Sequence, residues 1–209
     1  MIVTTDEQRK IVERINKDFA RTVARYDAWK YPEDAYSGLR DRFLAPVTVS
    51  ADDIRQALVW KYGHWRKNGY PSSHQALIQK ICREWPRFVA TSEDSTVRAD
   101  FDFWTKTLKG HHSFITVCFL VHLVHSDNVA ILDQHNYRAM NYLVGTVRPG
   151  WVAKKKPSNF QDLCNVSDFI TCISNYWSLI PGTTAPSKRA IDKYLMVSGQ
   201  RLKRSLCGE

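Results

Sequence analysis

The stretch SFITVCFLVHLVHSDNVAILDQHNYRAMNYLV, Ser113 to Val144, decides the fold that we predict for this chain. Its first dozen or so residues are apolar on nearly every face, a run too long for a strand and too short to cross a bilayer. We therefore predict a helix buried at the centre of the protein. A short polar break and a second, amphipathic run follow, and Asp133 stands where that second run begins.

Asp133 has two interpretations. A carboxylate at the start of a helix accepts hydrogen bonds from free backbone amides and lies at the positive end of the helix dipole, an effect of roughly 0.3–1 kcal/mol. In the first interpretation Asp133 has only this structural role of a helix cap. The same position favours the ionised carboxylate at neutral pH, which is the form that can stabilise a developing positive charge.

The rest of the chain has helical periodicity and no convincing strand pattern. One apolar stripe runs from Ile11 to Tyr26 on a single expected helix, and Ser50 with Asp53 forms a capping box ahead of another. A further helix is expected to end at Pro86, because proline cannot continue the backbone hydrogen bonding. These patterns predict an all-α protein, one compact domain of eight or nine helices over residues 1–209.

The net charge of +9 is unevenly distributed along the chain. Residues 138–209 contain 11 Lys and Arg against 4 Asp and Glu, whereas residues 1–137 contain 19 against 17. A basic C-terminal part suits a polyanion, and nucleic acid is the leading partner. A solvated surface that only aids solubility is the alternative.

Other features of the chain argue against several classes of protein. The five cysteines are odd in number and form no C-x-x-C pair, so we expect reduced thiols. The N-terminus lacks the pattern of a secretory signal, and no apolar run is long enough for a membrane span. Walker, dinucleotide-binding and serine-nucleophile motifs are absent. We expect a cytoplasmic protein without membrane segments or cofactors.

The segment from Ile131 to Ala139, ILDQHNYRA, resembles the one that carries the catalytic aspartate in the helix-hairpin-helix DNA glycosylase superfamily. In that family a hairpin of the form Leu-Pro-Gly-x-Gly precedes the aspartate. The segment LKGHH, Leu108 to His112, falls at the corresponding distance and keeps only the first glycine. The resemblance implies a glycosylase-like all-α fold with a degenerate hairpin.

Phe114 occupies the place where bifunctional members of the 8-oxoguanine and endonuclease III branches carry a Schiff-base lysine. The resemblance therefore implies base release through water, without lysine-dependent nicking of the strand. Asp133 would act as the catalytic carboxylate, by stabilising an oxocarbenium-like sugar or by orienting and deprotonating water. The family's cysteine-held iron-sulfur cluster is missing from this chain.

DNA-binding candidates surround these motifs. The first turn after Asp133 could meet phosphate or the base, and the hairpin could meet the DNA backbone. A flipped base also needs a pocket and a wedge, which aromatic residues near basic ones could supply, although each aromatic could equally be core. The candidates are Gln134, His135, Asn136 and Arg138, then Lys109, Gly110, His111 and His112, then Trp60, His64, Trp65 and Trp151, and the loop residues Lys154, Lys155 and Lys156.

His122 and His125 are three residues apart on the expected buried helix, and with Asp133 or His135 they could form a metal site. The spacing is loose and lacks an H-E-x-x-H pattern. We expect no metal here, and predict buried or pocket-lining histidines.

The function expected from this resemblance is monofunctional excision of a modified or damaged base from double-stranded DNA. Compact bacterial proteins that look like this branch are associated with defence against phage, and one kind removes glucosylated hydroxymethylcytosine. Housekeeping repair of oxidised bases is an alternative within the same class. A non-catalytic DNA-binding or regulatory module, or an RNA-binding protein using the aromatic and basic cluster near Trp60, is an alternative outside it.

Overall fold

The computed structural model describes residues 3–64, 69–92, 96–110 and 113–207, with side chains described as far as residue 203. Every regular element in these ranges is helical, and they comprise ten α-helices and one 3₁₀-helix. The all-α prediction is therefore confirmed, with one α-helix more than the upper number expected. None of the described helices is long and apolar enough to cross a membrane.

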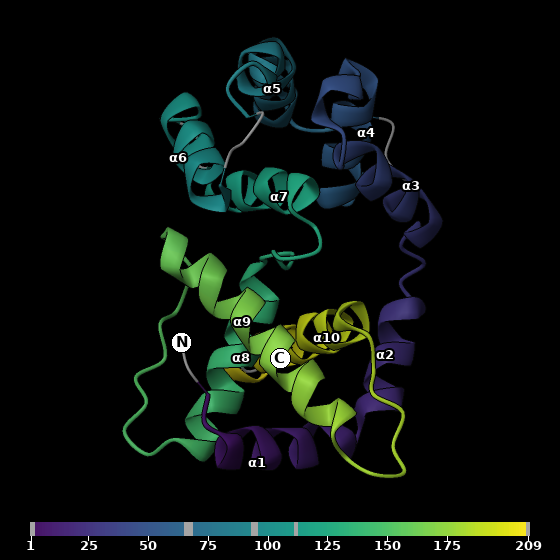
Figure 1. Ribbon diagram of the computed structural model, residues 1–209, viewed down its shortest axis with the longest axis vertical. Coiled ribbons are helices and arrows are strands. Elements are labelled where there is room, and N and C mark those ends of the chain that lie inside the picture. The colour runs from purple at the N-terminus through teal and green to yellow at the C-terminus, as the bar shows by residue number, and fades with distance from the viewer. Residues whose placement is uncertain (1–2, 65–68, 93–95, 111–112, 208–209) are drawn as a thin grey trace. The chain divides into compact units, whose positions relative to one another are not determined.

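Within the range that we predicted as one domain, the chain forms two compact units. Unit 1 is built from both ends of the chain, Met1–Tyr31 and Ala130–Glu209, and unit 2 from Pro32–Val129. The helices of unit 1 are α1 (Thr5–Asn16), α2 (Phe19–Asp27), α8 (Gln134–Val147), α9 (Phe160–Ser178) and α10 (Lys188–Cys207) (Figure 1). Those of unit 2 are α3 (Glu33–Phe43), η1 (Pro46–Thr48), α4 (Ala51–Lys61), α5 (Ser72–Val89), α6 (Val97–Thr107) and α7 (Phe114–Val124).

Unit 2 is organised around α7. Every residue from Thr116 to Leu123 is buried, because the sequence gives this helix no polar face to turn towards water. The predicted buried helix is confirmed. The capping box of Ser50 and Asp53 at the start of α4 is confirmed as well.

Helix α5 continues past Pro86, where we predicted its end. Pro86 lies inside the helix, which reaches Val89. Proline removes one backbone donor and crowds the preceding turn. Its neighbours Trp85 and Phe88 are only 4% and 1% exposed, and their ring centroids lie 5.1 Å apart. Burying these two rings from a helical backbone outweighs the cost of the proline.

The first apolar stripe is divided between α1 and α2, although we predicted one helix. Asp18, between them, leaves the helical conformation with φ −140° and ψ 17°. Its carboxylate accepts hydrogen bonds from the hydroxyls of Thr22 (3.0 Å) and Tyr194 (3.2 Å). A short polar side chain that bonds its surroundings in this way competes with helical backbone bonding, and the break adds a helix to the count.

The C-terminal end of α8 is tied to α1 by an ion pair. Arg148 donates from Nε and Nη2 to the two carboxylate oxygens of Glu7, both at 2.6 Å. These bonds lower the pKa of Glu7 from 4.5 to about 2. A carboxyl group with a lower pKa in the folded state adds stability above its unfolded pKa, and this stability is lost as the pH falls through the folded value.

We therefore expect the free energy of unfolding to fall as the pH drops from about 4.5 to about 2. Arg148→Gln should remove much of this dependence, because the Glu7 carboxylate then has no guanidinium to hold it ionised. Denaturant unfolding of wild type and R148Q at a series of pH values measures the difference. Equal slopes for the two proteins in that window would contradict the prediction.

Candidate active site at the start of α8

Asp133 caps α8, as predicted. Ile131 and Leu132 ahead of it are 7% and 0% exposed and anchor the chain. The Asp133 backbone is extended, with φ −138° and ψ 159°, and its Oδ1 accepts from the His135 N–H at 2.7 Å. Its own N–H donates to Oδ1 of Asn136 at 2.8 Å, which completes a capping box. Asp133 itself remains partly exposed.

Asn136 turns into unit 1 from the first turn of α8. It is 1% exposed, and its Nδ2 donates to the carbonyl of Ile131 (2.5 Å) and to Oδ1 of Asp192 in α10 (2.9 Å). We expected Asn136 to contact DNA. Its burial corrects this, because the side chain links the cap to α10 instead.

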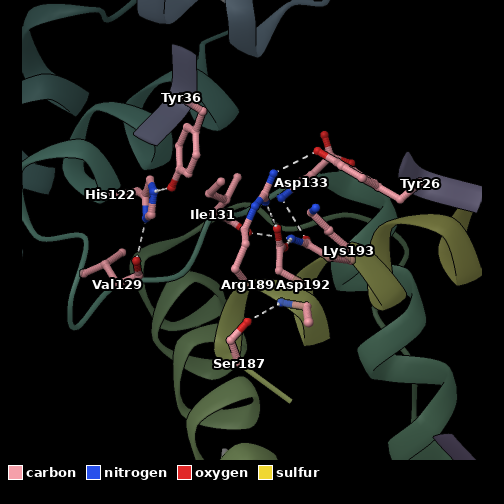
Figure 2. Close-up of polar contacts among 12 residues, drawn as sticks. Tyr26, Tyr36, His122, Val129, Ile131, Asp133, Ser187, Arg189, Asp192 and Lys193 are labelled. Carbon is pink, nitrogen blue, oxygen red and sulfur yellow. Dashed lines mark hydrogen bonds and ion pairs between the residues drawn. The ribbon is translucent and has the colours of Figure 1, made fainter. Parts of the chain in front are cut away.

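Arg189 and Tyr26 extend this link to α2. Arg189 donates from Nη1 to Oδ2 of Asp192 and from Nη2 to the Tyr26 hydroxyl at 2.8 Å, and its guanidinium lies 5.4 Å from the Tyr26 ring centroid. Hydrogen bonds between ionised partners are about twice as strong as neutral ones. Asp133, Asn136, Asp192, Arg189 and Tyr26 thus form a continuous series of polar contacts, named here the cap network (Figure 2).

His135 and Arg138 lie on the same first turns of α8. Arg138 Nη1 donates to the carbonyl of Gly199 (2.9 Å) and lies 3.2 Å from Nδ1 of His135. Because a guanidinium has only donors, Nδ1 accepts and the ring proton is on Nε2. Burial lowers the pKa of His135 below its usual 6.5. The His135 ring also has a hydrogen bond to the Gly199 backbone, and Gln134 beside it is exposed.

The degenerate hairpin belongs to unit 2, between α6 and α7. Gly110 has φ +89°, a conformation that side chains with a Cβ rarely adopt, so the one retained glycine is needed for this turn. Lys109 is exposed next to it. His111 and His112 lie outside the described residues.

Trp60 and His64 are buried in unit 2, at 5% and 6% exposure. Trp60 stacks on Tyr36 and Phe119, with ring centroids 4.6 and 5.9 Å away. His64 Nε2 lies 3.0 Å from Nδ1 of His74. The sequence allowed these rings to be either core residues or a platform for a base. Their burial shows that both belong to the core of unit 2. Trp65 falls outside the described residues.

Trp151 packs against the C-terminal half of α8. Its Nε1 donates to Oδ1 of Asn141 at 3.3 Å, and the Arg148 guanidinium lies 5.4 Å from its ring centroid. At 1.5 Å per residue, Asn141 lies about 12 Å along the helix from Asp133. The structure therefore does not bring Trp151 to the cap as a wedge.

The three lysines of the basic loop after α8 do not have the same ionic contacts. Lys154 forms an ion pair with the buried Asp162 of α9 at 2.5 Å, and Asp162 also accepts from the Tyr137 hydroxyl at 2.8 Å. Lys155 and Lys156 are exposed. These two lysines, rather than Lys154, are the stronger candidates for contacts with phosphate.

The histidines of α7 and its C-terminal end have structural partners within unit 2. His122 Nδ1 donates to the carbonyl of Val129 (2.6 Å), and its Nε2 lies 2.5 Å from the Tyr36 hydroxyl (Figure 2). His125 pairs with Asp100 at 2.7 Å. The burial predicted for His122 is confirmed. Nowhere in the described ranges do three or more His, Cys, Asp or Glu side chains gather so that they could hold a metal ion.

Unit 1 carries nearly all of the net charge. It contains 18 Lys and Arg against 10 Asp and Glu, whereas unit 2 contains 12 against 11. The basic bias seen in residues 138–209 thus belongs to the same unit as Asp133. A polyanion would be attracted to this unit first.

Sequence reasoning did not single out Tyr26, Arg189, Asp192 or Gly199. The signals for three of them were weak: Arg189 and Asp192 have the i, i+3 spacing of a helical ion pair, and Gly199 is an isolated glycine in an apolar helical pattern. Comparisons of the chain with protein-family models, with curated proteins and with solved structures find no match.

Proposed function

We propose that this chain is a monofunctional DNA glycosylase, in which Asp133 stabilises the deoxyribose as its bond to a modified base breaks. The observation that carries the proposal is the cap of α8, where Asp133 has a partly exposed carboxylate bonded to the His135 N–H and a backbone N–H held by a buried polar network. Hydrolysis of an N-glycosidic bond passes through a transition state with oxocarbenium character. A fixed negative charge beside that sugar stabilises the transition state more than the substrate.

The cap of α8 differs from the other capping boxes of the described chain. Those at α1, α4 and α9 begin with Thr4, Ser50 and Asn159, which are neutral. The box at α8 begins with a carboxylate, and its partner Asn136 is bonded to the pair of Asp192 and Arg189. Helix capping alone requires neither feature.

Two further observations support DNA as the substrate. Unit 1 is strongly basic, and the first turn of α8 presents the exposed Gln134 where the helix dipole favours anions. Phe114 stands at the position of the family's Schiff-base lysine, which supports base release by water. The product would be an abasic site in an intact strand.

For the substrate we propose a heavily modified base, with glucosylated hydroxymethylcytosine in phage DNA as the first choice. The support is the divergence from the repair branches at the hairpin and at Phe114. A modified base also costs less to unstack and flip than a well-paired ordinary one. Oxidised bases, the substrates of housekeeping repair, are the second choice.

The direct test is to incubate the protein with phage DNA containing glucosylated hydroxymethylcytosine, with oxidised DNA and with unmodified DNA. Abasic sites are then quantified with an aldehyde-reactive probe, and strand breaks before and after alkali. We expect abasic sites in one modified DNA and breaks only after alkali. Binding to every DNA without abasic sites would favour a non-catalytic DNA-binding module, and preferred binding of single-stranded RNA would favour the RNA-binding alternative.

The exposed loop lysines should contribute to the affinity for DNA. Neutralising Lys155 and Lys156 to Gln is expected to reduce the slope of log affinity against log salt by roughly 2, because each phosphate contact contributes about 0.9. Fluorescence anisotropy at a series of salt concentrations measures it. Lys10→Gln in α1 with Lys17→Gln at the C-cap of α1 removes the same charge and is the matched control. Equal slopes for the two double variants would contradict a specific role for the loop.

A further inference from the structure

We infer that Asp192 is a positioning residue for Asp133, acting through the side-chain amide of Asn136. This inference rests on the proposed function and names a residue that the excision chemistry would need outside the reacting atoms. Asp192 is 7% exposed and lies 56 residues from Asn136 in the chain. Its contribution is to decide which way the amide of Asn136 faces.

The orientation of Asn136 follows from its three neighbours. The N–H of Asp133 needs an acceptor, whereas the Ile131 carbonyl and the Asp192 carboxylate can only accept. The amide satisfies all three with Oδ1 towards Asp133 and Nδ2 towards the other two. A flipped amide would set its oxygen against the carbonyl and the carboxylate, and would lose every one of these bonds.

Arg189 stabilises this orientation of the Asn136 amide by holding Asp192 in place. It donates to the second oxygen of Asp192 and is itself held by the hydroxyl and ring of Tyr26. The Asp192 carboxylate is therefore kept in place beside Nδ2 of Asn136, and a hydrogen bond to a carboxylate is charge-assisted. Without Asp192, the Asp133 N–H and the Ile131 carbonyl would still favour this orientation, but the charge-assisted bond would be lost.

The consequence for Asp133 is a backbone held at its N–H and a carboxylate bonded to the His135 amide. A catalytic group that is displaced by about 1 Å can lose about a hundredfold in rate. Loosening the cap should therefore slow the chemical step and leave DNA binding unchanged, because Asp192 is buried and away from solvent.

The test compares single-turnover base release and DNA affinity for wild type, Asp192→Asn and Asp192→Ala on the DNA that wild type excises. We expect the rate to fall by about tenfold in D192N and about a hundredfold in D192A, with affinity within about twofold of wild type. Hydrogen exchange of the Asp133 amide, followed by NMR, should be faster in D192A. D192N is the milder variant if D192A does not fold.

Asp53 provides the matched control. It is 8% exposed, belongs to the capping box of α4 and pairs with Arg42, so Asp53→Asn and Asp53→Ala disturb an equivalent cap in unit 2. These variants should lose stability without the rate effect. A D192A rate within about twofold of an active wild type, or the same rate loss in D53A, would overturn the inference alone. Equal exchange of the Asp133 amide in wild type and D192A would overturn it even without an activity readout, whereas no base release by wild type would overturn the proposed function.

Discussion

Asp133→Asn is expected to lower the single-turnover rate of base release by about a thousandfold, in line with the loss of one electrostatic or general-base group. Asn has the same shape and keeps an oxygen that can accept from the His135 N–H. Asn and Asp are comparable N-caps, so the helix start should survive with a stability change below about 1 kcal/mol. What the variant removes is the negative charge that we propose acts on the reacting sugar.

DNA affinity should separate this role from a binding role. A carboxylate repels phosphate, so the affinity of D133N should equal or exceed that of wild type. Asp6→Asn in α1, where the side chain is 59% exposed, removes the same charge from unit 1 and serves as the control for that effect. Its rate should match wild type. A D133N rate within about tenfold of wild type would leave Asp133 as a structural cap.

The chain already contains a cap of the kind that the variant creates. The N-cap of helix α9 is Asn159, whose side chain accepts from the Asp162 N–H in a capping box. An Asn therefore supports this backbone geometry elsewhere in unit 1. A loss of folding in D133N would then point to the charge itself, and denaturant unfolding of the variant measures it alongside the rate.

The features that the sequence predicted correctly are local ones. The apolar run of α7 has no polar face, and Asp133 and Ser50 stand in front of periodic runs with a bonding partner three residues later. Such patterns are set by hydrogen bonds and burial within one or two turns. For this reason the buried helix and both helix starts could be predicted without any knowledge of tertiary contacts.

The features that the sequence did not predict depend on contacts between distant segments. Asp192 meets Asn136 across 56 residues, and its i, i+3 spacing from Arg189 indicates only a helical ion pair, with no sign of Asn136. The aromatic and basic composition around Trp60 suited either a base platform or a core. Only packing against Phe119 of α7 shows that Trp60 belongs to the core. Pro86 is similar, because burial of its neighbours overrode a local rule.

Gly199 is the position where such a distant contact should be most costly to disturb. We expect Gly199→Ala to lower the free energy of unfolding by about 3 kcal/mol, at the upper end of the range for overpacking. A Cβ at this position would lie 1.8 Å from the carbonyl oxygen of His135 and 2.5 Å from its carbonyl carbon. Both atoms are helical backbone, so no side-chain rotation can relieve the overlap. Helices α8 and α10 would have to separate.

This separation would occur at the first turn of α8, next to Asp133. Because the hydrogen bond from Arg138 to the Gly199 carbonyl crosses the same contact, we expect G199A to lower base release as well, by roughly tenfold or more at a temperature where the variant remains folded. Calorimetry should show a melting temperature lower by roughly 6–12 °C, given about 2–4 °C per kcal/mol for a chain of this size.

Gly145→Ala is the control that separates a specific overlap from the general effect of adding a methyl group. Gly145 also lies in a helix, but a Cβ there meets the Trp151 ring at 3.5 Å, an ordinary contact. Alanine is favoured over glycine inside helices by roughly 0.5–1 kcal/mol, so G145A should be as stable as wild type or more stable. The change in the free energy of unfolding should therefore have opposite signs in the two variants. The added carbon overlaps backbone atoms at position 199 and makes an ordinary contact at position 145. If G199A were as stable as G145A, then α8 and α10 would lie farther apart than in this structure. The hydrogen bond from Asn136 to Asp192, which crosses between the same two helices, would then not form.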